Sequence, residues 1–238
     1  MKILALSTST PRGSAALVRD GVEVAASVYV DLQGHSARLF EAIDAVLAQA
    51  GEGRGALEGL ACDVGPGSFT GVRVGVASAK GIALGLGLPL AGVVSLEAMA
   101  AAAFAAGAAG PGSVVLAAVD AKKSEVFLAA YDAAGTVLLA PCARPLAPAA
   151  FALDFPPGPG SPGLPGPPGP RVVVVGEVAA GIALPAGVSL ARGASFDLPD
   201  AAWIGRLAAA RLGREPGDEI EPLYVRAPDA TPARREVG

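Results

Sequence analysis

The side chains best suited to chemistry gather in the first turn of the chain and in one glycine-rich turn. Ser7, Thr8, Ser9 and Thr10 form a hydroxyl cluster that could contact a phosphate, although hydrogen bonds within the turn explain these residues equally well. The segment Gly65–Gly71, GPGSFTG, precedes a predicted helix, so its backbone amides could hold an anion. Alternatively, its glycines only permit a tight turn. It is not a Walker loop, because Lys80, the nearest lysine, lies well along the helix.

The other polar side chains form no complete catalytic set. His35 is the single histidine, and four residues further on stands Leu39, which cannot ligate a metal. Metal sites usually combine several His, Cys or carboxylate groups, so a capping or surface role is the simpler interpretation of His35. Asp120 follows a predicted strand beside Lys122 and is interpreted as a turn charge. Nothing supports a Ser-His-Asp or Cys-His arrangement, which would have to use His35.

The composition is that of a globular protein, since 52% of the 238 residues are hydrophobic and 17% are charged. The net charge of -4 argues against a surface that binds nucleic acid by neutralising phosphates alone. Cys62 and Cys142 are too few for a disulfide framework and are interpreted as free thiols in a reducing cytosol. No secretion signal is recognised at the start, and the apolar run Ala98–Ala109 is too short to cross a bilayer. We therefore expect a soluble, cytoplasmic protein without a membrane contact.

The elements that must position these residues follow one order twice. In the first half, the patterns predict strands at Ile3–Ser7, Ser14–Arg19, Val22–Val30, Gly59–Val64 and Leu90–Val94, with helices at Ser36–Ala50, Phe69–Leu86 and from Ser95 to near Gly107. In the second half, they predict strands at Ser113–Val119, Ser124–Tyr131, Thr136–Ala140 and Arg171–Gly176, with helices at Pro148–Leu153 and Pro199–Gly213. The repeated order β-β-β-α-β-α predicts an α/β protein of two similar lobes, residues 1–109 and 110–238.

Two segments interrupt or follow the second lobe. Residues 155–170 repeat glycine every third residue in a run too short for a collagen triple helix, so we expect a flexible surface loop. Residues 227–238 are expected to be a frayed tail.

The helix predicted at Phe69–Leu86 carries almost no charge and a stripe of small residues. Gly71, Gly75, Ala79 and Ala83 recur every four residues and therefore share one face. A stripe without side-chain bulk lets another helix, or another protein, come close. We expect the remaining elements to act as a frame for this helix.

Six segments, in one order along the chain, resemble the TsaB family, also called YeaZ: ILALSTSTPRGSAALV, GHSARLFEAIDAVL, GPGSFTGVRVGVASAKGIA, VSLEAMA, VDAKKSEVFLAAYD and EPLYVRAPDA. The third segment is the most specific. The resemblance implies the two-lobed fold of actin, Hsp70 and sugar kinases, known as the ASKHA or ribonuclease H-like fold. It also implies a role in making N6-threonylcarbamoyladenosine at position 37 of tRNAs that read codons starting with A.

The resemblance further implies a division of labour. Members of this family are non-catalytic companions of a paralogous catalytic subunit, TsaD, and an ATPase, TsaE, completes the bacterial assembly. The family commonly has Asp-Thr-Ser where this chain has Ser7, Thr8 and Ser9, and the paralogue holds its metal with a His-x-x-x-His pair that here corresponds to His35 and Leu39. A hydroxyl does not replace a carboxylate beside Mg²⁺. We therefore expect no metal, no cofactor, no catalytic residue and at most weak nucleotide contact at Ser7, Thr8 and Ser9, with tRNA contacted only indirectly.

The family's partner surface is built from two helices of the first lobe, which pair with matching helices of TsaD as a four-helix bundle. Here these are the helices at Ser36–Ala50 and Phe69–Leu86. The side chains expected to face the partner are Leu39, Ile43, Val46, Val72, Val76, Ala79 and Ala83. Without TsaD, the same face could form a homodimer, because a twofold contact uses one patch on both subunits.

Two enzymatic alternatives remain. The first is a small ATPase or kinase of the same fold that acts in the cleft between the lobes. The second is a glycopeptidase-like metalloprotease, which a chain with one histidine supports poorly.

Overall fold

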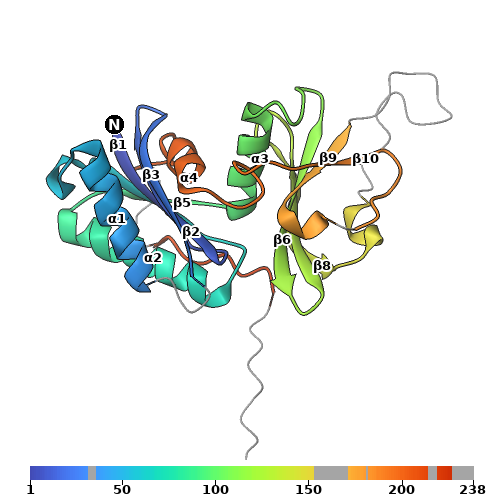
Figure 1. The fold of residues 1–238 in the computed structure, drawn as a ribbon, viewed down its shortest axis with the longest axis horizontal. Coiled ribbons are helices and arrows are strands. Elements are labelled where there is room, and N and C mark those ends of the chain that lie inside the picture. Colours follow the sequence, from blue (N-terminus) through green and yellow to red (C-terminus); the bar gives the residue numbers. More distant parts are fainter. Residues whose placement is uncertain (32–35, 153–170, 181, 214–218, 227–238) are drawn as a thin grey trace, which may run out of the picture.

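The computed structural model describes residues 1–31, 36–152, 171–180, 182–213 and 219–226, arranged as two lobes (Figure 1). His35, the loop at 155–170 and the tail at 227–238 lie outside the described residues. No helix in the described ranges is both long and apolar enough to cross a membrane.

The first lobe is built on a five-stranded sheet in the order β3-β2-β1-β4-β5. Its strands are β1 (Lys2–Ser7), β2 (Arg12–Arg19), β3 (Val22–Val30), β4 (Gly59–Asp63) and β5 (Leu90–Val93). β2 pairs antiparallel with both β1 and β3, whereas β1, β4 and β5 run parallel. The parallel strands are buried along nearly their whole length, as their apolar sequences predict.

The second lobe repeats this topology with a sheet in the order β10-β9-β6-β7-β8. Its strands are β6 (Val114–Lys122), β7 (Glu125–Tyr131), β8 (Val137–Pro145), β9 (Val172–Val175) and β10 (Val188–Ala191). The pairing again combines an antiparallel hairpin and meander with parallel strands. The predicted duplicated α/β fold of the actin, Hsp70 and sugar-kinase type is therefore confirmed.

In the part of the chain that the structure describes, four α-helices cover the sheets: α1 (Ser36–Ala50), α2 (Phe69–Leu86), α3 (Ser95–Ala105) and α4 (Ala201–Ala208). Short 3-10 turns lie at Arg54–Ala56 (η1), Pro148–Phe151 (η2) and Glu177–Ala179 (η3). The bounds of α1 and α2 agree with those predicted. α4 is shorter than predicted, and β10 has no counterpart among the predicted strands.

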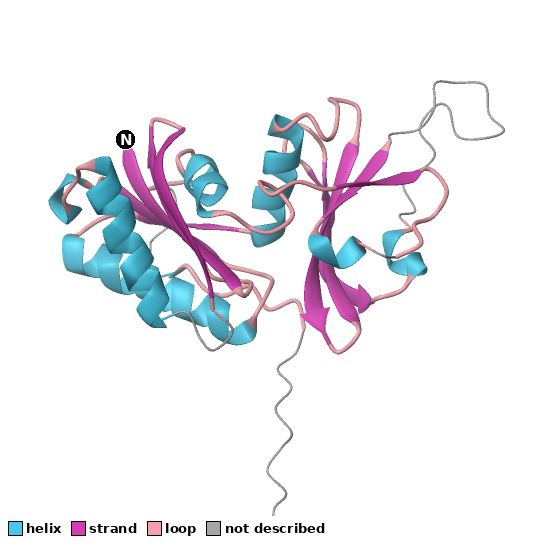
Figure 2. Ribbon diagram, viewed as in Figure 1, coloured by secondary structure: helices cyan, strands magenta, loops and turns pink. Residues whose placement is uncertain are grey.

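The helices cross between the two halves of the chain. α1 and α2 pack on one face of the first sheet and α4 packs on the other. α3 belongs to the first half but packs mainly on β6, β7 and β9 of the second sheet. α3 and α4 also contact each other, and Figure 2 shows them between the two sheets. Each half of the sequence therefore contributes a helix that packs on the sheet of the other half, although the strands of each sheet come from one half.

Candidate functional site

Ser7, Thr8 and Ser9 at the end of β1 are buried, and the hydroxyls of Ser7 and Thr8 are engaged in local hydrogen bonds. Ser7 Oγ donates to Asp63 Oδ2 at 2.8 Å, and Thr8 Oγ1 donates to the carbonyl of Gly71 at 2.7 Å. The backbone amide of Thr8 donates to Asp63 Oδ1 at 3.3 Å. These bonds favour the structural interpretation of Ser7 and Thr8, because their hydroxyls hold β4 and α2. Ser9 lies at the wall of the cleft between the lobes.

Asp63 is a buried carboxyl that the sequence analysis did not single out. It ends β4, and Ser95 Oγ at the start of α3 also donates to it, at 3.4 Å. Burial raises the pKa of Asp63, and the hydrogen bonds that it accepts from the hydroxyl cluster oppose this effect. The sequence does mark Asp63 as unusual, because it is an acidic residue at the end of an otherwise apolar strand, shortly before a glycine-rich turn.

The glycines of the central turn and helix face this cluster at very short range. A Cβ on Gly67 would lie 2.1 Å from the carbonyl oxygen of Ser9, and one on Gly71 would lie 2.0 Å from that of Thr8. On Gly75, it would lie 2.2 Å from Thr8 Oγ1. The small-residue stripe thus lets α2 approach the chain's own first turn. The prediction that this stripe accommodates another protein is wrong.

The start of α2 is capped from within the chain. Ser68 Oγ accepts from the amide of Gly71 at 3.3 Å, and the amide of Ser68 donates to the carbonyl of Ser9 at 2.6 Å. Two of the amides that could have held an anion at this turn therefore have partners inside the lobe.

The seven side chains predicted to face a partner are instead buried in the first lobe. They are Leu39, Ile43, Val46, Val72, Val76, Ala79 and Ala83. All seven belong to the core cluster formed by α1, α2 and the first sheet. The physical reason is that the sheet needs an apolar cover, and the helical periodicity of these residues provides it. These seven side chains therefore lie on the faces of α1 and α2 that pack on the first sheet, and not on the faces open to a partner.

The opposite side of α2 is exposed, and its surface is largely apolar. We define the outward face by six exposed residues of α1 and α2: Phe40, Ala77, Gly81, Leu84, Gly85 and Leu86. Leu84 is 86% exposed and Phe40 is 46% exposed. Apart from the adjacent backbone of the helix itself, none of the described residues lies within 4 Å of a Cβ built on Gly81 or Gly85. Because a glycine within a helix costs about 1 kcal/mol relative to alanine, contacts inside the chain do not account for these two residues.

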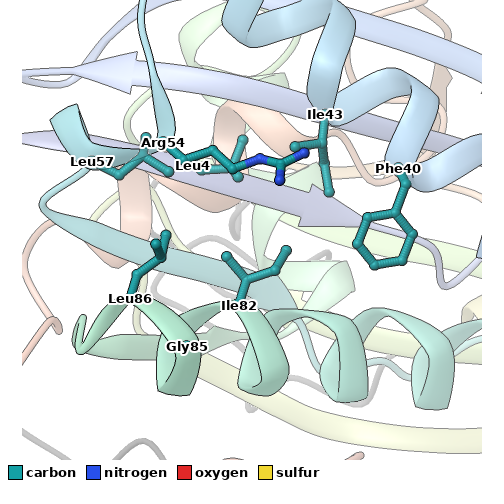
Figure 3. Close-up of a pocket in the computed structure, with 8 residues that line it drawn as sticks. All are labelled: Leu4, Phe40, Ile43, Arg54, Leu57, Ile82, Gly85 and Leu86. Carbon is teal, nitrogen blue, oxygen red and sulfur yellow. The ribbon is translucent and has the colours of Figure 1, made fainter.

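A groove of about 240 Å³ opens beside this face, between α1, α2 and η1 (Figure 3). Ile82 and Leu86 of α2 and Phe40 and Ile43 of α1 line it, together with Leu4, Arg54, Leu57 and Gly85. Arg54 is paired with Asp44 at 2.7 Å. The groove is thus an apolar recess with a compensated charge at its wall, which suits an apolar side chain of another protein.

The cleft between the lobes measures about 640 Å³ and has charged residues at its walls. Arg12 donates to the carbonyl of Ala194 and pairs with Asp200, both at 3.1 Å. Across the cleft, Lys122 pairs with Asp120 at 2.6 Å. Asp120 lies within β6 and not in a turn after the strand, so its interpretation as a turn charge is wrong. Both cations therefore already have carboxylate partners. Among the residues that the structure describes, no three His, Cys, Asp or Glu side chains are grouped to hold a metal ion.

Comparison with known proteins identifies relatives of this chain. Residues 30–164 match the family model described as TsaD, tRNA N6-adenosine threonylcarbamoyltransferase. The tRNA threonylcarbamoyladenosine biosynthesis protein TsaB of Escherichia coli is 40% identical over 132 residues, which are 56% of this chain and 55% of that protein. The alignment thus spans about half the length of that curated relative.

Two further similarities extend over nearly the whole chain. A protein of Mycobacterium tuberculosis whose own function is uncharacterized is 34% identical over 233 residues, which cover 97% of this chain and 94% of that protein. The solved structure of YeaZ from Pseudomonas aeruginosa superposes with a TM-score of 0.72 at 27% identity and covers 94% of this chain and 99% of that one. The similarity in structure thus includes both lobes.

Proposed function

Since this chain belongs to the TsaB (YeaZ) family, we propose that it is a non-catalytic subunit in the biosynthesis of N6-threonylcarbamoyladenosine in tRNA, which acts by binding TsaD. The relatives' names support the pathway. The outward face of α2 supports a role through binding. The proposed contact surface is this outward face, whose residues are exposed, and not the buried residues expected from the sequence.

The observation that carries the proposal is the exposure of Leu84 between Gly81 and Gly85. Leu84 is exposed together with Phe40 and Leu86, and an exposed apolar patch of this kind is typical of a surface that another protein covers. The two glycines leave room for a second helix to approach closely, and the groove beside them offers a recess for an apolar side chain. A helix of TsaD placed along α1 and α2 would use all three features.

A binding subunit can activate a catalytic one by population shift. If this chain binds the competent conformation of TsaD more tightly than the inactive one, it raises the population of the competent state by that difference in affinity. No side chain of this chain then needs to touch the tRNA or the threonylcarbamoyl group. Such a role agrees with the local hydrogen bonds that occupy Ser7 and Thr8.

Reconstitution with purified components tests the proposed function. The modification of tRNA is measured with TsaD, TsaE, this chain, ATP and an activated threonylcarbamoyl donor, and then with each protein left out in turn. We expect modification to stop, or to fall at least about tenfold, when this chain is absent. Undiminished modification without it would contradict the proposal.

The alternative of an ATPase or kinase rests on the volume of the cleft between the lobes. Arg12 pairs with Asp200 and Lys122 pairs with Asp120. These ion pairs oppose the enzymatic alternative, because phosphate binding to either cation would have to break them. Titration of the isolated chain with Mg-ATP in a calorimeter separates the two functions. We expect no micromolar binding, whereas micromolar binding with hydrolysis would favour the enzyme.

A further inference from the structure

Arg73 forms a rigid cluster with two exposed aromatic rings near the start of α2. Its Cζ lies 3.5 Å from the ring centroid of Phe69 and 5.5 Å from that of Tyr224. Its Nε donates to Tyr224 Oη at 2.8 Å, and the two ring centroids are 5.5 Å apart. These contacts hold the guanidinium against Phe69 and limit its rotamers.

Tyr224 comes from the other end of the chain and is itself held in place. The amide of the preceding Leu223 donates to the carbonyl of Val64 at 2.7 Å. On the other side, Val225 packs on the core cluster of α3 and the second sheet, and Arg226 pairs with Glu125. The tyrosine is therefore fixed between a contact to the first lobe and contacts to the second.

The guanidinium keeps unused hydrogen-bonding capacity. Within the described ranges, its hydrogen bond runs through Nε to Tyr224, and no carboxylate lies within ion-pair distance of Arg73. Arg12, Arg19 and Arg54, in contrast, each pair with a carboxylate. Phe69 is 45% exposed and Tyr224 is 46% exposed, so the cluster is open to solvent. A preorganised guanidinium with free terminal N–H groups is suited to bidentate binding of a carboxylate.

We propose that Arg73 binds a carboxylate of the protein partner, so that the Phe69–Arg73–Tyr224 cluster forms the charged end of an otherwise apolar interface. This inference rests on the proposed function. Arg73, Ala77, Gly81 and Leu84 follow one another at helical spacing, so the cluster continues the outward face along the same helix. One cation at the end of that face matches one acidic side chain.

An RNA phosphate is the other anion that an arginine could bind, and it fits this surface less well. Binding along a nucleic-acid backbone neutralises several phosphates with several cations. The outward face beyond Arg73 consists of apolar residues and glycines, and the chain carries a net charge of -4. The acidic side chain of a protein is therefore the occupant to which the inference commits.

The test measures the dissociation constant of the complex between this chain and purified TsaD at low and high salt. Arg73→Glu should weaken binding by about tenfold or more, because it places like charges opposite each other. Arg73→Lys should give an intermediate loss, since it keeps the charge but not the planar fork that stacks on Phe69. Arg171→Glu changes an exposed arginine directly before β9 by the same charge and should bind as the unaltered chain does. Melting temperatures of all variants verify that they fold.

The outcomes separate the inference from the proposed function. If Arg73→Glu binds TsaD as tightly as the unaltered chain, or no more weakly than Arg171→Glu, the inference is overturned and the proposed function stands. If the unaltered chain does not bind TsaD, the proposed function is contradicted and the inference falls with it. If Arg73→Glu loses binding to tRNA while it keeps TsaD, the occupant is RNA and the inference is wrong. An acidic-to-lysine change in TsaD that restores binding of Arg73→Glu would identify the carboxylate.

Discussion

At the scale of single residues, the molecule depends on how closely α2 approaches the end of β1. Thr8 offers its carbonyl and its hydroxyl to the space where Gly71 and Gly75 have no side chain. Asp63 receives the hydroxyl of Ser7 and the amide of Thr8 from the other side. These few polar groups join β1, β4 and α2 within the core of the first lobe.

We expect Gly71→Ala to destabilise the first lobe. The added methyl group would lie 2.0 Å from the carbonyl oxygen of Thr8, so the helix must shift and loses the hydrogen bond from Thr8 Oγ1. Overpacking of this kind costs about 1–3 kcal/mol. Urea unfolding measures the loss, and Gly81→Ala on the open side of the same helix is the control. An unchanged or higher stability of Gly71→Ala would contradict the observed packing.

We expect Asp63→Asn to change how stability depends on pH. Burial raises the pKa of Asp63 in the folded state above its unfolded value, so the charged form disfavours folding at neutral pH. As the pH falls through the folded pKa, the carboxyl gains a proton and the unaltered chain gains stability relative to the variant. This gain ends near the unfolded pKa of about 4.

Urea unfolding between about pH 7 and about pH 4 measures this difference. Glu41→Gln, which removes an exposed carboxylate of α1, is the control. A difference between the unaltered chain and Asp63→Asn that stays constant over this range would show that Asp63 does not titrate as its burial requires.

At the scale of elements, the sequence specified the helices better than their orientation. The bounds of α1 and α2 follow from apolar periodicity and from the turn residues around them. The buried side of α2 did not follow, because the helix is apolar or small nearly all round. It has one small-residue stripe at Gly71, Gly75 and Ala79 and a second at Ala77, Gly81 and Gly85. The first stripe packs inward against Thr8, a contact between distant parts of the chain that spacing within the helix does not encode.

We expect a larger side chain in the second, exposed stripe of α2 to weaken binding without a loss of stability. Gly81→Gln replaces an exposed glycine in the helix by a good helix former, so the free energy of unfolding should stay the same or rise by up to about 1 kcal/mol. The longer side chain should keep a partner helix at a distance and weaken binding to TsaD. Chemical unfolding and calorimetric titration measure the two effects.

A matched change on another helix makes this result specific. Ala105→Gln adds the same side chain at an exposed position of α3, away from the outward face, and should leave binding unchanged. A stabilised Gly81→Gln variant that binds TsaD as tightly as the unaltered chain would exclude a close helical contact at this stripe.

At the scale of the whole molecule, the duplication of lobes could be predicted and the exchange of helices could not. The order of elements indicated two similar sheets, and the structure has them. That α3 packs mainly on the second sheet and α4 on the first depends on long-range contacts, which the order of elements does not encode. β10 escaped prediction because its four residues, Val188–Ala191, are too few to show a period.

The same scale explains why the candidate site was predicted in part. The choice of α1 and α2 came from the resemblance to the TsaB family, whereas the choice of side chains came from apolar spacing. In a protein with a covered sheet, that spacing marks the residues that pack inward, such as Leu39 and Val76. The residues available to a partner are those that break the pattern of a solvent-facing helix, namely Leu84 and the exposed glycines beside it.

The most direct test of this account is the dissociation constant of the complex between this chain and TsaD, measured for the unaltered chain and for Leu84→Glu. Leu84 is 86% exposed, so the substitution should leave the melting temperature nearly unchanged. The account predicts that the unaltered chain binds and that Leu84→Glu weakens binding by about tenfold or more, because a charge would be buried in the contact. Equal binding of TsaD by both chains would contradict it.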